Sequence, residues 1–556
     1  MQKTLGLPTA AALLAGLLCF VTTPSLFAQV APPSGGCTVR TTPLSPGDKA
    51  FARGEYTKAI DAYRAELAAA PDPDRVHDAL VRSLLTHNNI ADAESDANAW
   101  MAKSPNTVWA VDALAEVQWR KGDVNSALAS MQKAVNIDGC NPRAHADVAQ
   151  ANRFSSRYLD AKIQINQAHH LDPFDEDILY EWLDTLPRET QLDWATLQLD
   201  KKETSDDERK WLTRWKETLS KPPEAPCKLV SKVASVTIPY RKIQDGPNAP
   251  VFWGLDVGFN GKNRRMQIDT GASGLNLYKS TANALHLDIE KAPYKTGGIG
   301  DDGAVNTYVA KVASIKIGAL EFTDCVVHIL DVKPNPDIPD SADDGLIGGD
   351  VFSSFLVTLD FPGHTLKLDT LPPVPGAEGE TETESLQTGV ESHASASQNR
   401  YVAPSMASWT KVFRSGSDLV IPVRLDKGPV KLFIVDTGAE LNLISPEAAG
   451  EVVKVMKGGE QIYGISGKAA KSYTTMPLTL IFGGMSQPTA GLTALDMTRM
   501  SSYAGIEMSG FLGQPTLKQM TVQIDYRDAL INFSFDPKRL VRCSAVANVN
   551  RVEDCF

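Results

Sequence analysis

The feature that most constrains this chain is a strand-and-turn pattern that occurs twice. Residues 267–277 read QIDTGASGLNL and residues 434–444 read IVDTGAELNLI, which places Asp269 and Asp436 167 residues apart. In each copy an apolar strand leads into an Asp-Thr-Gly-Ala turn, and aspartate and glycine are residues that favour turns. The fold therefore has to use one β unit twice.

The correspondence between the two copies continues downstream of the turn. LNL at 275–277 matches LNL at 441–443, GIG at 298–300 matches GIS at 464–466, and GLIGG at 345–349 matches GFLGQ at 510–514. The motifs keep their order and their spacing is nearly constant. The sequence therefore predicts two copies of one all-β lobe.

These motifs resemble those of the retropepsin and pepsin families of aspartic peptidases over about residues 231–540. The resemblance rests on the two DTGA turns after apolar strands, on the flap-like GGIGDDG and YGISGK, and on LIGG and FLG. It implies an aspartic endopeptidase in which Asp269 and Asp436 activate a water to hydrolyse a peptide bond. Two carboxyls held close share one proton, which provides one base and one acid without a metal or a cofactor.

The resemblance also implies roles for the residues that follow each aspartate. Gly271 and Gly438 let the two turns approach, and the hydroxyls of Thr270 and Thr437 bond across to the opposite turn. Ser273 is expected to hydrogen-bond the aspartate of the first lobe.

Two hairpins, at 297–303 and 463–467, are expected to close over an extended peptide, exclude water and pair with its backbone. The flap residues expected to contact a substrate are Gly298, Ile299, Gly300, Gly464, Ile465 and Ser466.

The two copies differ where Ser273 of the first is matched by Glu440 in the second. An ionised glutamate cannot donate a hydrogen bond, and near Asp436 it would push that carboxyl toward protonation. Such a shift would disable the dyad or move its working pH upward. This difference favours a catalytically impaired peptide-binding protein as one alternative to an active enzyme, and an envelope scaffold is a further alternative.

The N-terminal third of the chain carries a period of 34 residues. The period is visible in three sets, namely Ala59, Ala93, Ala127 and Ala161; Gly54, Asn88, Gly122 and Ser156; and Tyr56, Ile90, Val124 and Tyr158. This pattern resembles the tetratricopeptide repeat over about residues 46–180, with further capping helices to residue 218. The family stacks helix pairs into a superhelix that binds a peptide or a protein partner, although a purely architectural spacer is the alternative.

The ends of the chain and its charge bear on location and partners. Residues 1–28 have the layout of a secretory signal peptide, which predicts export to the periplasm or the extracellular space with no membrane anchor after cleavage. The net charge of −12 argues against nucleic acid as a partner. Six cysteines follow the signal peptide, which permits 15 disulfide pairings, and their spacing predicts no metal site.

The sequence thus predicts a multidomain α plus β protein, in which a helical repeat solenoid precedes two β lobes that form a pepsin-like pseudo-dimer within one chain. The expected segments are a signal peptide 1–28, an N-terminal linker 29–45, a repeat domain 46–218, a linker 219–230, lobe 1 at 231–370, a disordered linker 371–408, lobe 2 at 409–540 and a tail 541–556. A peptide or protein is the expected substrate, and the repeat domain is expected to hold the substrate or a protein partner.

Overall fold

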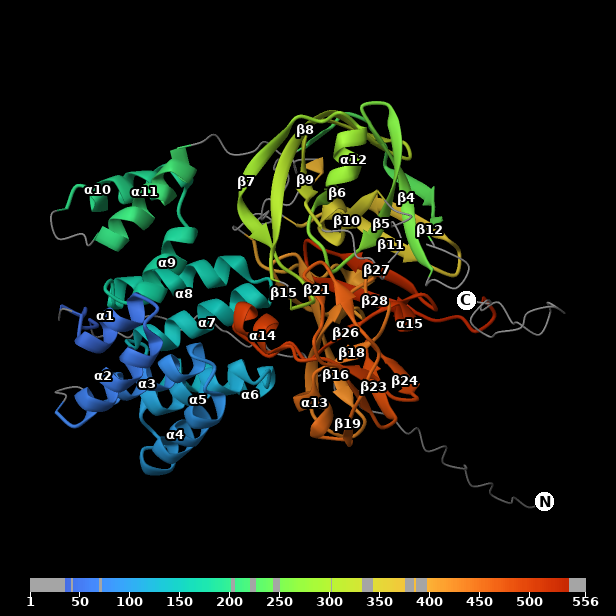
Figure 1. Ribbon diagram of the computed structural model, residues 1–556. Helices are drawn as coiled ribbons and strands as arrows, with labels where there is room; N and C mark the ends of the chain where they lie inside the picture. Colours follow the sequence, from blue (N-terminus) through green and yellow to red (C-terminus); the bar gives the residue numbers. More distant parts are fainter. Residues whose placement is uncertain are drawn as a thin grey trace, which may run out of the picture.

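The computed structural model describes residues 36–41, 44–69, 73–201, 206–220, 227–243, 251–301, 303–332, 344–375, 385–386 and 398–539. An array of helices lies beside two β lobes, which stack on one another (Figure 1). This arrangement confirms the predicted order of a helical region followed by two β-rich regions. The predicted signal peptide and the C-terminal tail lie outside the described residues.

The helices alternate along the array with short turns. Their bounds are α1 (Pro46–Ala52), α2 (Tyr56–Leu67), α3 (Pro73–Thr86), α4 (Ile90–Lys103), α5 (Val108–Arg120), α6 (Val124–Ile137), α7 (Pro142–Phe154), α8 (Tyr158–Leu171), α9 (Glu176–Asp184), α10 (Arg188–Leu199) and α11 (Asp206–Ser220). The repeated alanines lie in α2, α4, α6 and α8, where Ala59, Ala93 and Ala127 are fully buried and Ala161 is 9% exposed. Small side chains at these positions let neighbouring helices pack closely, as the 34-residue period predicts.

The turn before each of these helices is held by a left-handed residue. Gly54, Asn88, Gly122 and Ser156 have φ angles of 70°, 63°, 73° and 56°. Glycine and asparagine adopt this conformation more readily than other residues. The repeated turn-tolerant positions therefore mark the ends of α1, α3, α5 and α7.

Buried charges lie between α3, α5, α7 and the start of α9. Arg82 pairs with Asp175 at 3.0 Å, and Arg143 pairs with Glu116 at 3.1 Å. Burial and the charge of Glu116 raise the pKa of Asp78 to about 8. Burial also favours protonation of Asp175, but the charges of Arg82 and Arg143 outweigh it and lower the pKa of Asp175 to about 2. The stability of the helical array thus depends on groups with opposite responses to pH.

The β lobes are built from equivalent sheets. The first contains β1 (Cys227–Leu229), β3 (Arg241–Ile243), β4 (Phe252–Phe259), β5 (Lys262–Asp269), β6 (Leu275–Tyr278), β7 (Ile289–Thr296), β8 (Val305–Ile317), β9 (Leu320–Leu330), β10 (Gly345–Gly348) and β13 (Ser385–Leu386), with α12 (Lys279–Ala284) after β6 and the 3-10 helix η1 (Gly349–Phe352) after β10. Its central order is β6-β10-β5-β4-β8. A disulfide between Cys227 and Cys325 joins β1 to β9, and another joins Cys37 to Cys140 in the helical array.

The second lobe repeats this order as β18-β26-β17-β16-β23. Its sheet contains β15 (Phe413–Ser415), β16 (Asp418–Leu425), β17 (Val430–Val435), β18 (Leu443–Ile444), β19 (Val455–Lys457), β22 (Tyr473–Thr475), β23 (Leu478–Phe482), β24 (Met485–Thr489), β25 (Thr493–Ala494) and β26 (Gly510–Leu512). The hairpin β20 (Tyr463–Gly464) and β21 (Gly467–Lys468) and the helices α13 (Pro446–Gly450), α14 (Thr498–Ala504) and α15 (Gln514–Leu517) complete the lobe. The matching strand orders give the two lobes a pseudo-twofold relation.

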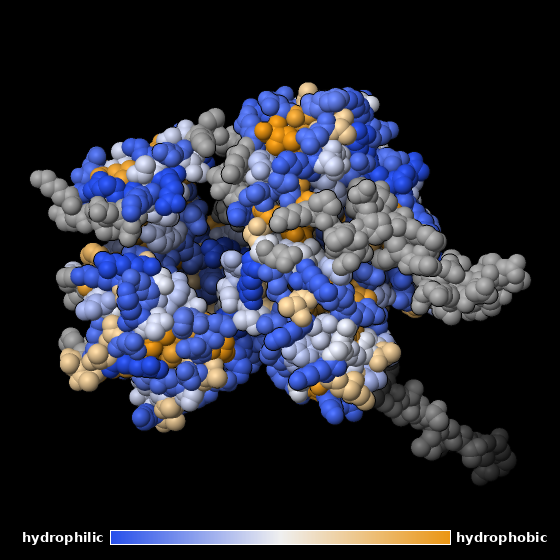
Figure 2. Space-filling view, in the orientation of Figure 1, coloured by the Kyte–Doolittle hydropathy of each residue, from blue (hydrophilic) through white to orange (hydrophobic). Residues whose placement is uncertain are grey.

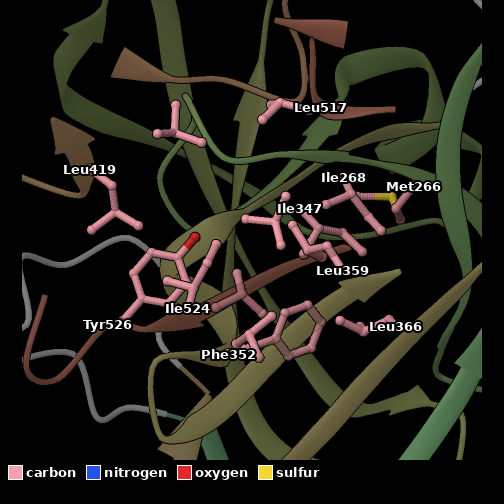
Figure 3. Packing of buried hydrophobic residues seen from close by; sticks show 14 of the residues in the cluster. Met266, Ile268, Ile347, Phe352, Leu359, Leu366, Leu419, Leu517, Ile524 and Tyr526 are labelled. Carbon is pink, nitrogen blue, oxygen red and sulfur yellow. The ribbon is translucent and has the colours of Figure 1, made fainter. Parts of the chain in front are cut away.

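A further sheet is shared by the two lobes. Lobe 1 contributes β2 (Ser235–Pro239), β11 (Phe355–Asp360) and β12 (Thr365–Thr370), and lobe 2 contributes β14 (Thr410–Lys411), β27 (Thr521–Asp525) and β28 (Leu530–Ser534). Strand β11 pairs with β27, and one hydrophobic core runs through both lobes. Figure 3 shows lobe 1 residues such as Ile268 and Ile347 packed in the same cluster as Ile524 and Tyr526 of lobe 2. The lobes are therefore one packed body.

The helical array also packs directly on lobe 2. Apolar side chains of α5, α6 and α7 share a core with Val420, Leu432 and Ile434. The ring of Phe154 stacks on that of Phe413, with centroids 4.9 Å apart. This apolar contact fixes the array against the second lobe, as Figure 1 shows for α6, α7 and α14. The outer surface of both parts is mostly hydrophilic on the face drawn in Figure 2.

Part of the segment expected to be a disordered linker, 371–408, is ordered. Ala403 and Met406 are buried against Leu530 beside the 3-10 helix η2 (Pro404–Met406). The backbone N–H of Arg400 donates to the carbonyl of Ser156 at 2.8 Å, which ties this segment to the helical array. The expectation of disorder is wrong for residues 398–408, because their apolar side chains find a buried site that their composition does not reveal.

The buried carboxyls of the array predict a pH dependence of stability. Because folding raises the pKa of Asp78, the free energy of unfolding falls as the pH rises from 3.8 to about 8. Because folding lowers the pKa of Asp175, the free energy of unfolding falls as the pH drops from 3.8 to about 2. We expect the apparent Tm of the full chain to be highest near weakly acidic pH and to fall toward pH 8.

Replacing Asp78 by Asn should flatten the fall in Tm between about pH 4.5 and 8, because the amide cannot ionise. The exposed Asp61→Asn variant is the charge-matched control and should keep the wild-type slope. Differential scanning fluorimetry measures both, and an unchanged slope in Asp78→Asn would contradict this account.

Candidate active site

Each Asp-Thr-Gly turn lies at the end of a central strand. Asp269 is the last residue of β5, with Gly348 of the parallel strand β10 beside it. Asp436 directly follows β17, and its N–H donates to the carbonyl of Leu512 in β26 at 3.0 Å. The LIGG and FLG motifs thus form the strands that hold the aspartates in place.

Hydrogen bonds between the two turns are reciprocal. The N–H of Thr270 donates to the Thr437 hydroxyl oxygen, and the N–H of Thr437 donates to the Thr270 hydroxyl oxygen, both at 3.0 Å. The Thr270 hydroxyl donates in turn to the carbonyl of Val435 at 2.7 Å, and the Thr437 hydroxyl to that of Ile268 at 2.8 Å. The cross-lobe bonds expected from the resemblance are present, and they fix the turns symmetrically.

Glycine follows each threonine because no side chain fits there. A Cβ atom at Gly271 would lie 2.8 Å from Oδ2 of Asp436, and one at Gly438 would lie 2.6 Å from Oδ2 of Asp269. Each glycine therefore leaves room for the aspartate of the opposite lobe, and any larger residue would force the lobes apart.

The two aspartates form a coupled pair within hydrogen-bonding reach of each other. Burial, followed by the charge of Asp436, raises the pKa of Asp269 well above its ordinary value. Burial also raises the pKa of Asp436, although Gly438 N–H and Ala439 N–H donate to its carboxyl at 2.7 and 3.1 Å. Raised pKa values in both carboxyls favour a proton shared by the pair, with which it can present an acid and a base together.

The resemblance led us to expect a hydrogen bond from the Ser273 hydroxyl to Asp269, but the hydroxyl donates to another residue. This hydroxyl donates to Oδ2 of Asp350 at 2.9 Å, and the N–H of Gly274 donates to the other oxygen of Asp350 at 2.8 Å. Asp350 lies in η1 and is 6% exposed. It braces the first turn from behind, and no motif in the sequence had pointed to it.

Lobe 2 replaces this serine–aspartate pair as a unit. Pro515 stands where lobe 1 has Asp350, and Glu440 stands where lobe 1 has Ser273. Instead, the side-chain amide of Gln514 donates to the carbonyl of Thr437 at 2.6 Å, and its backbone N–H donates to the carbonyl of Ala439 at 2.8 Å. The serine is therefore absent from the lobe that also lacks its partner.

The side chain of Glu440 is exposed to solvent. Its pKa is raised by partial burial and by the charge of Glu460, whereas the pKa of Asp436 is raised by burial. Burial, rather than the charge of Glu440, is thus the largest cause of the raised pKa of Asp436. A comparison of the residues after GLIGG and GFLGQ would have revealed the paired replacement.

The predicted flap residues of the two lobes meet each other. The N–H of Gly298 donates to the Ser466 hydroxyl at 3.1 Å, and the N–H of Ser466 donates to the carbonyl of Ile299 at 3.0 Å. Gly298 also lies against Ile465, and Gly464 lies against Ile299. The segment that follows β7 also meets β21, since the N–H of Asp301 donates to the carbonyl of Lys468 at 3.2 Å.

Gly300 has a φ of 120°, and a Cβ atom there would lie 2.5 Å from the carbonyl oxygen of Gly467. Only glycine allows the tips to interlock this closely. All six predicted flap residues therefore lie at or beside one junction between the lobes.

Apolar flap residues belong to the cluster that joins lobe 2 to the helical array. Ile462 and Ala469, which flank the second hairpin, are buried in this cluster, and Ile299 of the first flap packs against it. Arg120 of α5 donates to the Ser502 hydroxyl of α14 at 3.2 Å. The helices are thus connected through packed side chains to the flaps.

Comparison with known proteins supports the assignment of lobe 1. Residues 255–351 match the family model described as "Aspartyl protease", and this range includes Asp269 and Asp350. This part of the chain is an aspartyl protease domain. The match does not extend over lobe 2, whose likeness to lobe 1 rests on its motifs and strand order.

The other comparisons give no further information about the aspartyl protease domain. A solved structure of a thermophilic TPR protein from Thermus thermophilus is 16% identical, with a TM-score of 0.24, and the match covers 30% of this chain and 94% of that chain. No curated protein matches the chain.

Metal clusters and membrane-spanning helices are both missing from the described part of the chain. Its His, Cys, Asp and Glu side chains form no group of three or more that could hold a metal ion. Within the same residues, no helix has both the length and the apolar character needed to cross a membrane.

The cross-lobe threonines predict a large effect of one substitution. Thr437→Val keeps the side-chain shape but leaves the N–H of Thr270 and the carbonyl of Ile268 unpaired in a buried site. We expect a loss of about 2–4 kcal/mol in the free energy of unfolding, because each unpaired buried group costs about 1–3 kcal/mol. Urea denaturation measures it. Thr437→Ser retains the hydroxyl and should recover most of the loss, so equal stability of the two variants would refute this role.

Because Glu440 is exposed and interacts with Glu460, replacing it should not disturb the aspartate pair. We expect Glu440→Gln to leave the pH dependence of peptide cleavage unchanged within a few tenths of a unit. A shift as large as a full pH unit would show that the carboxylate of Glu440 acts on Asp436.

Proposed function

We propose that this protein is an exported aspartic endopeptidase that hydrolyses peptide bonds with a water activated between Asp269 and Asp436. The observation that carries the proposal is the reciprocal hydrogen bonding of Thr270 and Thr437, which brings the two carboxyls within bonding reach in one chain. The aspartyl protease domain of lobe 1 supplies one half of this site.

The chemistry follows from the shared proton of the pair. One carboxylate takes a proton from the water as the water attacks the peptide carbonyl carbon, while the protonated carboxyl donates to the carbonyl oxygen. The tetrahedral intermediate then collapses as a proton passes to the leaving nitrogen. Since the pair titrates as a unit, either aspartate can be the base.

The flaps favour an extended peptide as the substrate. The flap turns expose backbone groups in the region where the two lobes meet, and an extended chain can pair with such groups. The flap tips bond to each other through Gly298, Ile299 and Ser466, so entry of a substrate requires these bonds to open. Flap opening would thus be part of the catalytic cycle.

We assign the helical array a role in holding the protein substrate or a protein partner. This assignment is supported by the core that the array shares with lobe 2 and with Ile299, Ile462 and Ala469 of the flaps. A chain bound to the helices would lie next to the flap side of the lobes. Export is supported by the Cys37–Cys140 and Cys227–Cys325 disulfides, which persist in oxidising compartments.

Peptidase activity can be tested with the purified full chain and an unstructured protein such as casein. We expect pepstatin-sensitive cleavage that falls by on the order of 10²- to 10⁴-fold in Asp269→Asn and in Asp436→Asn, the contribution typical of a general acid–base group. Asp288→Asn, an exposed substitution in lobe 1, is the control and should keep wild-type activity.

Equal inactivity of the wild type and both aspartate variants from acid to mildly alkaline pH would refute the proposal. Retained peptide binding in such an inactive protein would instead favour the catalytically impaired peptide-binding protein that the Ser273-to-Glu440 difference suggests.

A further inference from the structure

A third carboxyl lies next to the aspartate pair, on one lobe only. In lobe 2 the antiparallel pairing of β16 with β17 sets Val420 opposite Ile434 and Arg424 opposite Val430. The recorded pairs end at Val420 and Ile434, and the same register continued by two residues would set Asp418 opposite Asp436. The charge of Asp436 acts on Asp418, as this proximity predicts. Side chains directly opposite each other in an antiparallel pair lie on the same face, with Cβ atoms about 4.5–5.5 Å apart.

The equivalent position in lobe 1 carries no charge. There Gly254 is opposite Gln267, and continuing that register sets Phe252 opposite Asp269. The pseudo-twofold symmetry of the site is therefore broken by a carboxyl in lobe 2 where lobe 1 has a phenyl ring.

Other polar groups surround Asp418 from each neighbouring element. Ser415 of β15 is its partner on the other side of the strand, and the neighbouring Arg414 donates to the carbonyl of Tyr526 at 3.1 Å. The charge of Asp350 in η1 of lobe 1 acts on Asp418, and the charge of Asp418 acts in turn on Asp269.

The ring of Tyr526 is buried in the same region, as Figure 3 shows beside Leu419. The tyrosine hydroxyl packs against Gly349 and has no hydrogen-bond partner among the described residues. The side chain of Asp418 is half-buried, and its charge acts on the buried Tyr526.

Burial, followed by the charges of Asp436 and Asp350, raises the pKa of Asp418 to about 8. In acidic and neutral solution Asp418 is therefore an uncharged carboxylic acid and leaves the first ionisation of the pair unaffected. Near pH 8 it becomes negative. The negative charge then opposes loss of the proton that Asp269 and Asp436 still share, because like charges disfavour further ionisation.

We propose that Asp418 is a positioning residue that keeps the Asp269–Asp436 pair singly protonated to higher pH and so extends the working range of the enzyme on its alkaline side. The inference rests on the proposed peptidase function. Only lobe 2 carries this additional carboxyl, so the difference between the lobes would itself set the upper pH limit of the pair.

The test is the pH profile of kcat/KM for Asp418→Asn in the full chain. We expect the alkaline limb to move down by about one pH unit, the size of effect typical of a nearby like charge, while the acid limb stays in place. Glu447→Gln, an exposed change of the same charge in lobe 2, should move neither limb. Asp418→Glu retains the carboxyl and should keep the alkaline limb near its wild-type position.

A second readout separates this inference from the proposed function. Carboxyl ¹³C NMR of aspartate-labelled protein follows the ionisation of the pair whether or not the protein cleaves peptides. The upper titration step should move down in Asp418→Asn and not in Glu447→Gln. An unmoved upper step, or equal shifts of both steps, would overturn the inference, whereas a moved step in an inactive protein would refute only the peptidase proposal.

Discussion

The reciprocal hydrogen bonds of Thr270 and Thr437 are the interaction on which the rest of the site depends. Each threonine accepts from the backbone N–H of the other and donates to a carbonyl in the opposite lobe. These bonds bring Asp269 and Asp436 close enough to share a proton. Gly271 and Gly438 make the approach sterically feasible, because a Cβ atom at either would overlap the facing carboxyl.

The surrounding structure holds this junction in place while allowing the lobes to differ. The sheet shared by the lobes and their common core join them behind the turns. Lobe 1 braces its turn with Asp350, and lobe 2 does so with Gln514. Asp418 faces the pair from lobe 2 alone. The backbone frame is therefore symmetric, whereas the groups that set the charge around the pair are not.

Much of the site and of the fold could be predicted from the sequence, because both the active-site motifs and the helical repeats recur at regular spacing. The duplicated turns identify Asp269 and Asp436, and the 34-residue period locates the helices and their left-handed turns at residues such as Gly54 and Asn88. The partner of Ser273 is Asp350, which lies 77 residues away in the chain. The neighbour of Asp418 is Asp436, which lies 18 residues away and is set by strand register. No local sequence pattern encodes either relation. The contact between the helical array and lobe 2 is equally hidden, since Phe154 and Phe413 look like ordinary core residues.

One chain is expected to supply both aspartates of a single catalytic pair. The stoichiometry of pepstatin binding, measured by isothermal titration calorimetry on the monomeric full chain, is the decisive experiment. We expect one inhibitor per chain, with binding lost when either Asp269 or Asp436 is replaced by Asn. One inhibitor per two chains, or undiminished binding by either variant, would contradict this expectation.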